Sequence, residues 1–443
     1  MKLIDHPTVQ KLQSEGPPPP VSDAPLDADG LKALALQLGA DDVGFVGIDR
    51  PELDDQRGHI RAVYPATRTL ISLVCRMNRE PVRSSVRSVA NQEFHATYDA
   101  VNEVARHLTG ALEAEGIGAV NAVSAFPMEA QEFPKRIWTV AHKPLAEAAG
   151  LGRMGIHRNL IHPKFGNFVL LGAVLIDREV SLESRPIDYN PCLECKLCVA
   201  ACPVGAILPD GGFNFSACYT HNYREFLGGF KDWVETVAEA GSAADYNDRF
   251  SAGETVSLWQ SLSFKPGYKA AYCISVCPAG EDVIGPFLKD RRAFREQVVK
   301  PLTEKREMIY AVPGSDAERT VKKRFPHKTV RPVRSSLVPT DIPGFLFGLT
   351  LSFQRGRAKT LSATYQFTFT GKEEVQATVR IHKGRLTVTP GLVGRADLRL
   401  SADSETWLKF LGRRHSLLKA LLLRRFRLKG NPRLLPAFAR CFS

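Results

Sequence analysis

Apolar residues in the first two hundred positions recur either at helical spacing or as short continuous runs. Helical spacing indicates amphipathic helices, and runs of fewer than twelve apolar residues are typical of buried strands. A glycine at position 116 closes the longest of these helices, as glycine often does. The predicted elements are helices at 27–40, 96–116 and 143–150, and strands at 43–48, 69–77 and 167–177. They predict an ordered core, which we place at residues 28–187.

The last hundred residues follow a different pattern, in which apolar and polar side chains alternate. Residues 364–371 alternate aromatic with polar side chains, and residues 375–381 do the same with aliphatic ones. Two adjacent runs of this kind predict a half-buried antiparallel hairpin. A further strand at 396–401 and helices at 404–412 and 416–423 follow the hairpin. The pattern therefore predicts a separate α+β domain at residues 345–443.

Two segments show neither pattern. Residues 1–27 contain four consecutive prolines at 17–20 and are predicted to be a flexible tail with a stiff spacer. Residues 301–344 are basic and interrupted by prolines, which predicts a linker. The whole chain of 443 residues is long enough for two or three domains.

The net charge of +12 is concentrated in the last third of the chain, at 321–334 and 412–430. Such stretches favour nucleic acid, lipid headgroups or an acidic redox partner, or they are solvated basic faces. The longest apolar run, residues 168–176, is far shorter than the roughly 20 residues that span a bilayer. The N-terminus carries no signal sequence, and we expect a cytoplasmic protein without a transmembrane segment.

Four of the nine cysteines lie in one motif, C-x2-C-x2-C-x3-C-P, at Cys192, Cys195, Cys198 and Cys202. Thiolates at this spacing are typical of bacterial iron–sulfur sites, whereas zinc sites usually have two pairs separated by a longer loop. In the bacterial pattern the fourth cysteine ligates a different cluster from the first three. The motif therefore predicts two clusters and requires a distant cysteine to complete the first.

Cys277, which is also followed by proline, is the candidate that completes cluster one with Cys192, Cys195 and Cys198. Cluster two then takes Cys202, Cys218 and Cys273, and Ala270 stands where its fourth cysteine is expected. The open alternatives are His221 as a substitute ligand, a three-iron cluster, or an iron bound by water or substrate. Cys75 and Cys441 are predicted to have no cluster role.

Glycines are dense at Gly150, Gly152 and Gly155, and Asp177 follows about twenty residues later, as in a dinucleotide-binding fingerprint. A helix precedes these glycines where the fingerprint requires a strand, so a nicotinamide site is disfavoured. The glycines instead indicate a close approach of the backbone to a cofactor, or a simple loop.

The glycine segment followed by the cysteine block resembles the epoxyqueuosine reductase and reductive dehalogenase group of iron–sulfur, cobamide-dependent reductases. The resemblance covers roughly residues 30–300 and includes Gly150, Gly152, Gly155, Asn159, His162, Pro163 and Gly166. It implies a nitroreductase-like α/β core with an inserted two-cluster ferredoxin domain at 188–300. It also implies two [4Fe-4S] clusters in line with a corrinoid, which the glycine-segment residues Gly150, Gly152, Gly155, Asn159, His162 and Gly166 would help to bind. A low-potential donor such as a ferredoxin or flavodoxin would supply the electrons.

The chain departs from this family at Ala270 and at an acidic residue that the epoxyqueuosine reductases carry in a D-S-A-P stretch. The corresponding stretch, residues 123–133, has Val123 or Ser124 there, so epoxyqueuosine is disfavoured as the substrate. A reductase still needs a positioned proton source. Candidates by chemistry are Tyr98, His95, Glu129, Glu132 and His142.

Residues 360–440 resemble the sterol-carrier-protein type two lipid-binding family, which implies a sheet with helices over an apolar tunnel. The tunnel candidates, which could equally form the core, are Leu408, Phe410, Leu411, Leu417, Leu418, Leu421 and Leu422. Together, the two resemblances imply an α+β multidomain reductase that acts through a cobamide on a hydrophobic, lipid-like or halogenated substrate, with membrane-surface contact allowed and no nucleic-acid partner expected. The alternatives are a ferredoxin-type electron-transfer protein without corrinoid, and a lipid-binding protein with a structural or redox-sensing cluster domain.

Overall fold

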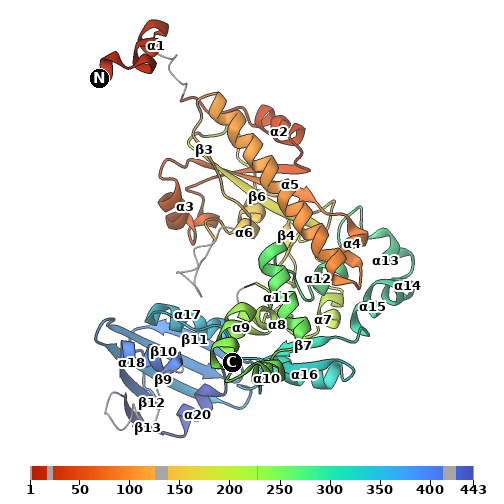
Figure 1. Cartoon of the computed structure of the whole chain (residues 1–443), viewed down its shortest axis with the longest axis vertical. Helices are drawn as coiled ribbons and strands as arrows, with labels where there is room; N and C mark the ends of the chain where they lie inside the picture. The colour runs from red at the N-terminus through yellow and green to blue at the C-terminus, as the bar shows by residue number, and fades with distance from the viewer. Residues whose placement is uncertain (1, 17–22, 125–137, 227, 413–425, 443) are drawn as a thin grey trace.

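The computed structural model describes residues 2–16, 23–124, 138–226, 228–412 and 426–442. The chain begins with a short 3-10 turn, Leu3–Asp5, and helix α1, Pro7–Glu15, which buries no side chain. The predicted tail is therefore helical over these residues. It projects from the body of the protein at the top of Figure 1.

A four-stranded antiparallel sheet forms the centre of the N-terminal core, in the order β1-β2-β6-β3. Its strands are β1 (Asp42–Gly47), β2 (Thr69–Arg76), β3 (Ala119–Asn121) and β6 (Val169–Ile176). Both central strands, β2 and β6, bury nearly every side chain, as their continuous apolar runs predict. The three predicted strands are confirmed.

Helices cover both faces of this sheet (Figure 1). On one face, α5 (Arg87–Ala114) and α2 (Ala28–Gln37) bury an apolar stripe that includes Val101 and Leu108. On the other face, Leu145 of α6 (His142–Ala148) packs in a second apolar cluster. The remaining elements of the core are η2 (Pro51–Leu53), α3 (Arg57–Val63), α4 (Arg79–Arg83), β4 (Arg153–Met154) and β5 (Leu160–Ile161).

The cysteine-bearing region is helical. Its elements are α7 (Leu197–Ala201), α8 (Phe215–Asn222), α9 (Gly228–Glu239), α10 (Ala243–Arg249), α11 (Ala252–Phe264), α12 (Tyr272–Ser275), α13 (Gly285–Lys289), α14 (Arg291–Phe294), the π-helix Arg295–Val299 and α15 (Lys300–Thr303). Cys198 and Cys202 lie in the same buried cluster as Tyr272, so α7 and α12 share one core.

The segment 301–344, predicted to be a linker, is folded instead. It contains β7 (Met308–Ala311), α16 (Asp316–Arg324) and β8 (Thr329–Pro332), and β7 pairs with β8 in parallel. Ile309 and Val321 are buried in the core that also holds Cys198 and Cys202. The basic residues gave the segment its linker-like composition, but its few apolar side chains are sufficient to pack it onto the cysteine region.

The C-terminal part has a five-stranded sheet in the order β11-β10-β9-β12-β13. Its elements are α17 (Ile342–Ser352), β9 (Ser362–Thr370), β10 (Val375–His382), β11 (Arg385–Pro390), β12 (Leu398–Asp403), α18 (Ser404–Leu411), β13 (Phe426–Gly430) and α20 (Leu434–Ala439). The predicted hairpin is confirmed, with Tyr365 opposite Val379 in the β9–β10 pair.

An aromatic core fills the C-terminal part. Phe345 of α17 contacts Phe367, Phe369 and Trp407, with ring centroids 5.3 to 6.0 Å apart. Leu408, Phe410 and Leu411 pack against this core as partly buried side chains. The predicted helix 416–423, with Leu417, Leu418, Leu421 and Leu422, lies outside the described residues. No helix among the described residues is long and apolar enough to cross a membrane.

Candidate iron–sulfur centres

The four cysteines assigned to cluster one line a single small cavity. Cys192, Cys195, Cys198 and Cys277 all contribute to its wall, beside Ile156 and His157. Glu194 and Lys196 have left-handed backbone conformations, with φ of 49° and 63°, which fold the cysteine loop tightly back on itself. Cys195 is exposed, whereas Cys198 and Cys277 are buried. The sequence motif and the distant Cys277 thus meet around one space.

The electrostatics of this cavity suit iron ions, whose positive charge would offset that of the thiolates. Burial, together with the neighbouring thiols Cys195, Cys192 and Cys273, raises the pKa of Cys277 to about 12. Burial also raises the pKa of Cys198, and Cys273 and Cys277 add to that shift. Thiols that resist ionisation because they crowd one another become thiolates when iron supplies the opposite charge.

The three cysteines assigned to cluster two also lie together. Cys218 on α8 has its pKa raised well above the usual value by burial and by the nearby Cys202 and Cys273. Cys202, at the end of α7, accepts a hydrogen bond from the Ala206 backbone N–H at 3.2 Å. The two groups of thiols lie close to each other. This closeness shows in the pKa of Cys198 and of Cys277, which the cluster-two thiol Cys273 also raises.

Ala270 occupies a buried position in the core that holds Cys202, and Cys218 and Cys273 pack against that core. Its backbone N–H donates to Asn222 Oδ1 at 3.1 Å, and the N–H of Ala271 donates to the same oxygen at 2.7 Å. The loop before Cys273 is therefore fixed by Asn222. It presents a methyl group where a fourth thiolate was expected.

His221 is buried but contacts other groups. Its Nδ1 accepts the Tyr310 backbone N–H at 3.3 Å. Burial, together with the charges of Lys269, Lys328, Arg224 and Lys305, lowers its pKa to about 3. The hydrogen bond described for the ring connects it with β7, and its buried Nε2 has no hydrogen-bond partner among the described residues. None of the described contacts joins the ring to a thiol, so His221 as the fourth ligand stays a prediction.

Lys143 and Asn159 form a chain of hydrogen bonds that ends at Cys273, one of the thiols assigned to cluster two. The Asn159 side-chain amide donates to Cys273 Sγ at 3.7 Å, and Lys143 Nζ donates to Asn159 Oδ1 at 2.7 Å. The ammonium group of Lys143 lowers the pKa of Cys273 and of Cys218, against the larger effect of burial. Lys143 was not among the predicted site residues, because no spacing in the sequence connects it with cysteines far along the chain.

The glycines of the predicted cofactor segment approach other parts of the protein. A Cβ on Gly166, whose φ is 63°, would overlap the Ala279 carbonyl oxygen, and one on Gly150 would lie 2.3 Å from the Arg185 carbonyl oxygen. Gly152 faces the Ile161 carbonyl oxygen in the same way, and Gly155 faces the Ile161 and His157 side chains. These glycines therefore permit close backbone packing, and Gly166 joins the segment to the loop after Cys277.

His162 has a structural environment. It is buried, its Nε2 lies 3.1 Å from Asp42 Oδ2, and its Nδ1 accepts the Lys164 backbone N–H at 3.1 Å. Of the residues predicted to bind a cofactor, Asn159 alone has a contact with a cluster thiol among those described. The described residues of this segment thus offer no cradle into which we can place a corrinoid.

Tyr98 is connected with the cluster-two thiols through two other tyrosines. Its hydroxyl is 3.3 Å from that of Tyr268, and the Tyr268 ring contacts the Tyr223 ring edge-on with centroids 5.5 Å apart. Burial raises the pKa of Tyr223, and Cys218, Tyr98 and Cys273 raise it further. The sequence did not single out Tyr223 and Tyr268, because a tyrosine a few residues from a cysteine has no distinctive spacing.

The other candidates are less closely connected with the thiols. Burial and Lys265 lower the pKa of His95, and burial lowers the pKa of His142 to about 4 despite contacts with the backbone of Val123 and Gly172. Both rings are therefore neutral at pH 7 and are poor acids. Glu129 and Glu132 lie outside the described residues.

Two family models match parts of the chain. The 4Fe-4S binding domain matches residues 185–208, and the SCP-2 sterol transfer family matches residues 350–443. The cysteine region is thus of the ferredoxin type and the C-terminal part is of the sterol-carrier type, which confirms these two expectations. The α+β multidomain class is confirmed as well.

The chain is also similar to epoxyqueuosine reductases, as its motifs predicted. It is 34% identical to the enzyme of Aliivibrio fischeri over 150 residues, which is 28% of this chain and 40% of that one. It is 27% identical to the enzyme of Gloeobacter violaceus over 208 residues, 45% of this chain and 59% of that one. The chain therefore spans about half the length of the curated relatives it matches.

A solved epoxyqueuosine reductase with an epoxyqueuosine-modified tRNA stem loop is 17% identical to the chain. The alignment covers 62% of this chain and 78% of that one, with a TM-score of 0.36. A catabolic reductive dehalogenase is 21% identical over 43% of this chain and 26% of its own, with a TM-score of 0.35. TM-scores this low do not establish a common fold.

Proposed function

We propose that the chain is an iron–sulfur reductase of the epoxyqueuosine reductase kind that carries two neighbouring clusters. The observation that supports this most is the convergence of four thiols on one cavity with three more thiols beside it. Cys192, Cys195, Cys198 and Cys277 would hold cluster one, and Cys202, Cys218 and Cys273 would hold cluster two. When bound, such clusters supply one-electron transfer.

The surroundings of the two sites suggest a direction for the electrons. Cys195 is exposed, so cluster one would lie near the surface, where a ferredoxin or flavodoxin can approach. Cluster two lies beside Lys143 and the Tyr98–Tyr268 pair, which can hold protons close to the reduced centre. Electrons would enter at cluster one and leave at cluster two, toward a substrate that also receives a proton.

A corrinoid remains a prediction of the family resemblance alone. The predicted glycine segment packs against other backbone, and we derive no step through a cobamide. Cobalt in anaerobically purified protein, or its absence after incubation with cobalamin, decides this point.

The reductase-like part and the sterol-carrier-like part of the chain favour different substrates. The curated relatives are epoxyqueuosine reductases, and one solved epoxyqueuosine reductase is bound to an epoxyqueuosine-modified tRNA stem loop, so the expectation that nucleic acid is excluded is not retained. The sterol-carrier match favours an apolar molecule delivered to cluster two, and this is the second candidate. The basic stretch at 321–334, part of which forms α16, could serve either an RNA backbone or a headgroup.

The experiment that tests the proposal measures iron and reductase activity together. Anaerobically purified protein should contain about eight irons, or about seven with a three-iron second cluster. It should oxidise reduced methyl viologen when it is given its substrate. Epoxyqueuosine-containing tRNA stem loop and an apolar extract are compared as substrates. Protein that binds no iron after reconstitution with iron and sulfide would overturn the proposal.

A further inference from the structure

Two arginines next to the candidate clusters have buried nitrogen atoms without hydrogen-bond partners among the described residues. They are Arg83, at the end of α4, and Arg87, at the start of α5. In each, Nε and Nη2 are buried and unpaired. A buried guanidinium with unpaired donors is costly, so a native protein is expected to place a negative group beside it.

Arg87 packs against the residue that precedes Cys273, one of the thiols assigned to cluster two. Its Nη1 donates to the carbonyl oxygens of Val82 at 3.2 Å and Ser84 at 2.9 Å, and its guanidinium carbon is 5.3 Å from the centre of the Tyr272 ring. Tyr272 directly precedes Cys273, and Arg87 Nη1 also lies 3.5 Å from the hydroxyl of Ser275 in the same helix. Burial lowers the pKa of Arg87, and Tyr272, Glu307 and Cys273 oppose that shift. None of the ion pairs among the described residues includes Arg87.

Arg83 packs against Phe294, which belongs to the core that also holds Cys198 of cluster one. Its guanidinium lies over the rings of Phe168 and Phe294, at 5.3 and 5.5 Å, and its side chain is 13% exposed. Its one described ion pair, with Glu80 at 3.7 Å, is weak because the Glu80 side chain is 87% exposed. Burial lowers the pKa of Arg83, and Glu80 and the Cys277 thiol oppose that shift.

A four-iron cluster held by thiolates is an anion, and its charge becomes more negative when it accepts an electron. It would therefore supply the negative group that both arginines lack. We propose that Arg87 is the electrostatic partner of cluster two and Arg83 that of cluster one, and that each arginine raises the reduction potential of its own cluster. This inference rests on the proposed two-cluster function.

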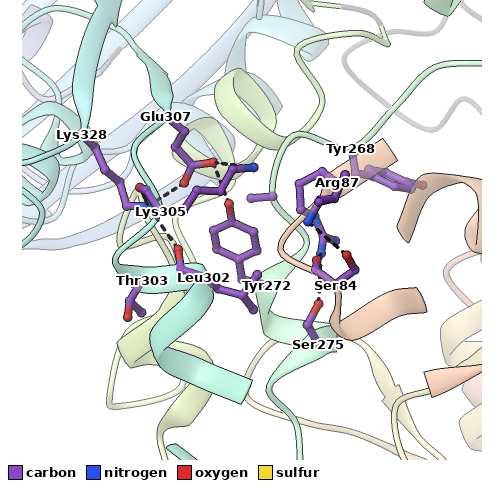
Figure 2. A network of polar contacts seen from close by, with 12 residues as sticks. Ser84, Arg87, Tyr268, Tyr272, Ser275, Leu302, Thr303, Lys305, Glu307 and Lys328 are labelled. Carbon is purple, nitrogen blue, oxygen red and sulfur yellow. Dashed lines mark hydrogen bonds and ion pairs between the residues drawn. The ribbon is translucent and has the colours of Figure 1, made fainter. Parts of the chain in front are cut away.

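A buried polar network fixes the position of Tyr272. It thereby also fixes the ring face that the Arg87 guanidinium packs against. Figure 2 shows the Tyr272 ring between Arg87 on one side and Glu307 on the other. The Tyr272 hydroxyl donates to Glu307 Oε2 at 2.7 Å, and Lys328 Nζ donates to Glu307 Oε1 at 2.7 Å. The side chain of Lys328 is fully buried.

The charges of this network add to the effect of Arg87. Arg87, Lys328 and Lys305 are cations, and Glu307 is the carboxylate between them. The network therefore carries a net positive charge, on the side of Tyr272 and Cys273. Neutralising Glu307 should raise the potential of cluster two, which is the opposite of the effect of removing Arg87.

The test is an EPR-monitored redox titration of the full chain with its clusters loaded, in which each reduced cluster has accepted one electron. Arg87→Met should lower the midpoint potential of cluster two and leave cluster one unchanged, and Arg83→Met should do the reverse. Arg87→Lys and Arg83→Lys, which keep the charge, should restore much of each shift. Each methionine variant is the control for the other.

Unchanged potentials in cluster-loaded variants, or equal shifts of both clusters in either variant, would overturn the inference. If Arg87→Met does not retain its iron, Glu307→Gln decides: a higher potential of cluster two supports the inference, and an unchanged or lower one overturns it. Wild-type protein without iron would instead refute the proposed function, so the two failures are distinguishable.

Discussion

The two groups of cysteines differ in how completely they are assembled. The cluster-one group has four thiols around one cavity, three of them from a single seven-residue stretch and the fourth, Cys277, from the distant loop after α12. The cluster-two group draws Cys202, Cys218 and Cys273 from three separate helical segments and lacks a fourth thiol at Ala270. The site built mainly from one local motif has four thiols, whereas the site built from three separate segments has three.

The difference suggests a division of labour. The thiols assigned to cluster one reach the surface at Cys195 and would give that cluster the full ligand set of an electron carrier. The thiols assigned to cluster two number three, and they lie beside Lys143, Asn159 and the Tyr98–Tyr268 pair. An open coordination position next to proton-bearing side chains is suited to contact with a further reactant.

The largest effect is expected from removing a cluster-one ligand. Cys198→Ala should lose cluster one and about half of the iron, because a buried thiolate that bridges the chain to the metal cannot be replaced by a methyl group. Iron analysis and visible absorption measure the loss. Cys75→Ala is the matched control, because Cys75 is buried in β2 and has no assigned cluster role. Equal iron loss in both variants would contradict the assignment.

An intermediate effect is expected from completing cluster two. Ala270→Cys should add a fourth thiolate and give a sharper, more oxygen-resistant four-iron EPR signal, with a gain of about one iron if the native cluster has three. Ala270→Ser, which adds a similar volume without a thiolate, is the control. If Ala270→Cys leaves iron content and EPR spectrum unchanged, the fourth ligand already comes from elsewhere.

The smallest effect is expected from His221. His221→Asn should leave the EPR signal of cluster two unchanged, since the described contacts of the ring are with Tyr310 and not with a thiol. Its folded-state pKa of about 3 lies below its ordinary value, so the unfolded chain takes up a proton that the folded chain does not. Stability is therefore lost as the pH falls from about 6.5 toward 3, by about 1.4 kcal/mol per pH unit for one such histidine.

The His221→Asn variant should show a shallower pH dependence of stability over that range. Urea unfolding at pH 6.5 and pH 5.5 measures the difference between the variant and the wild type. An altered cluster-two spectrum in the variant would show that His221 is a ligand after all.

The same contrast explains what the sequence could predict. The thiols of cluster one, the core strands and the C-terminal hairpin follow from local spacing and alternation, and they were predicted. Lys143, Tyr268 and Arg87 act through contacts between segments far apart in the chain, and no periodicity shows such contacts. The segment 301–344 was mistaken for a linker because its charge conceals the few apolar side chains that pack β7 and α16 onto the cysteine region.

The most direct test of the central claim, two neighbouring clusters in one chain, is the EPR spectrum of the fully reduced protein. With four irons in each cluster, the account predicts about two spins per chain, with splitting that arises from magnetic coupling between adjacent clusters. With a three-iron second cluster, it predicts one spin in the reduced protein and one in the oxidised protein. Cys198→Ala should remove the cluster-one spin together with any splitting. A single uncoupled spin in reduced, iron-saturated wild-type protein, with no signal from the oxidised protein, would contradict the account.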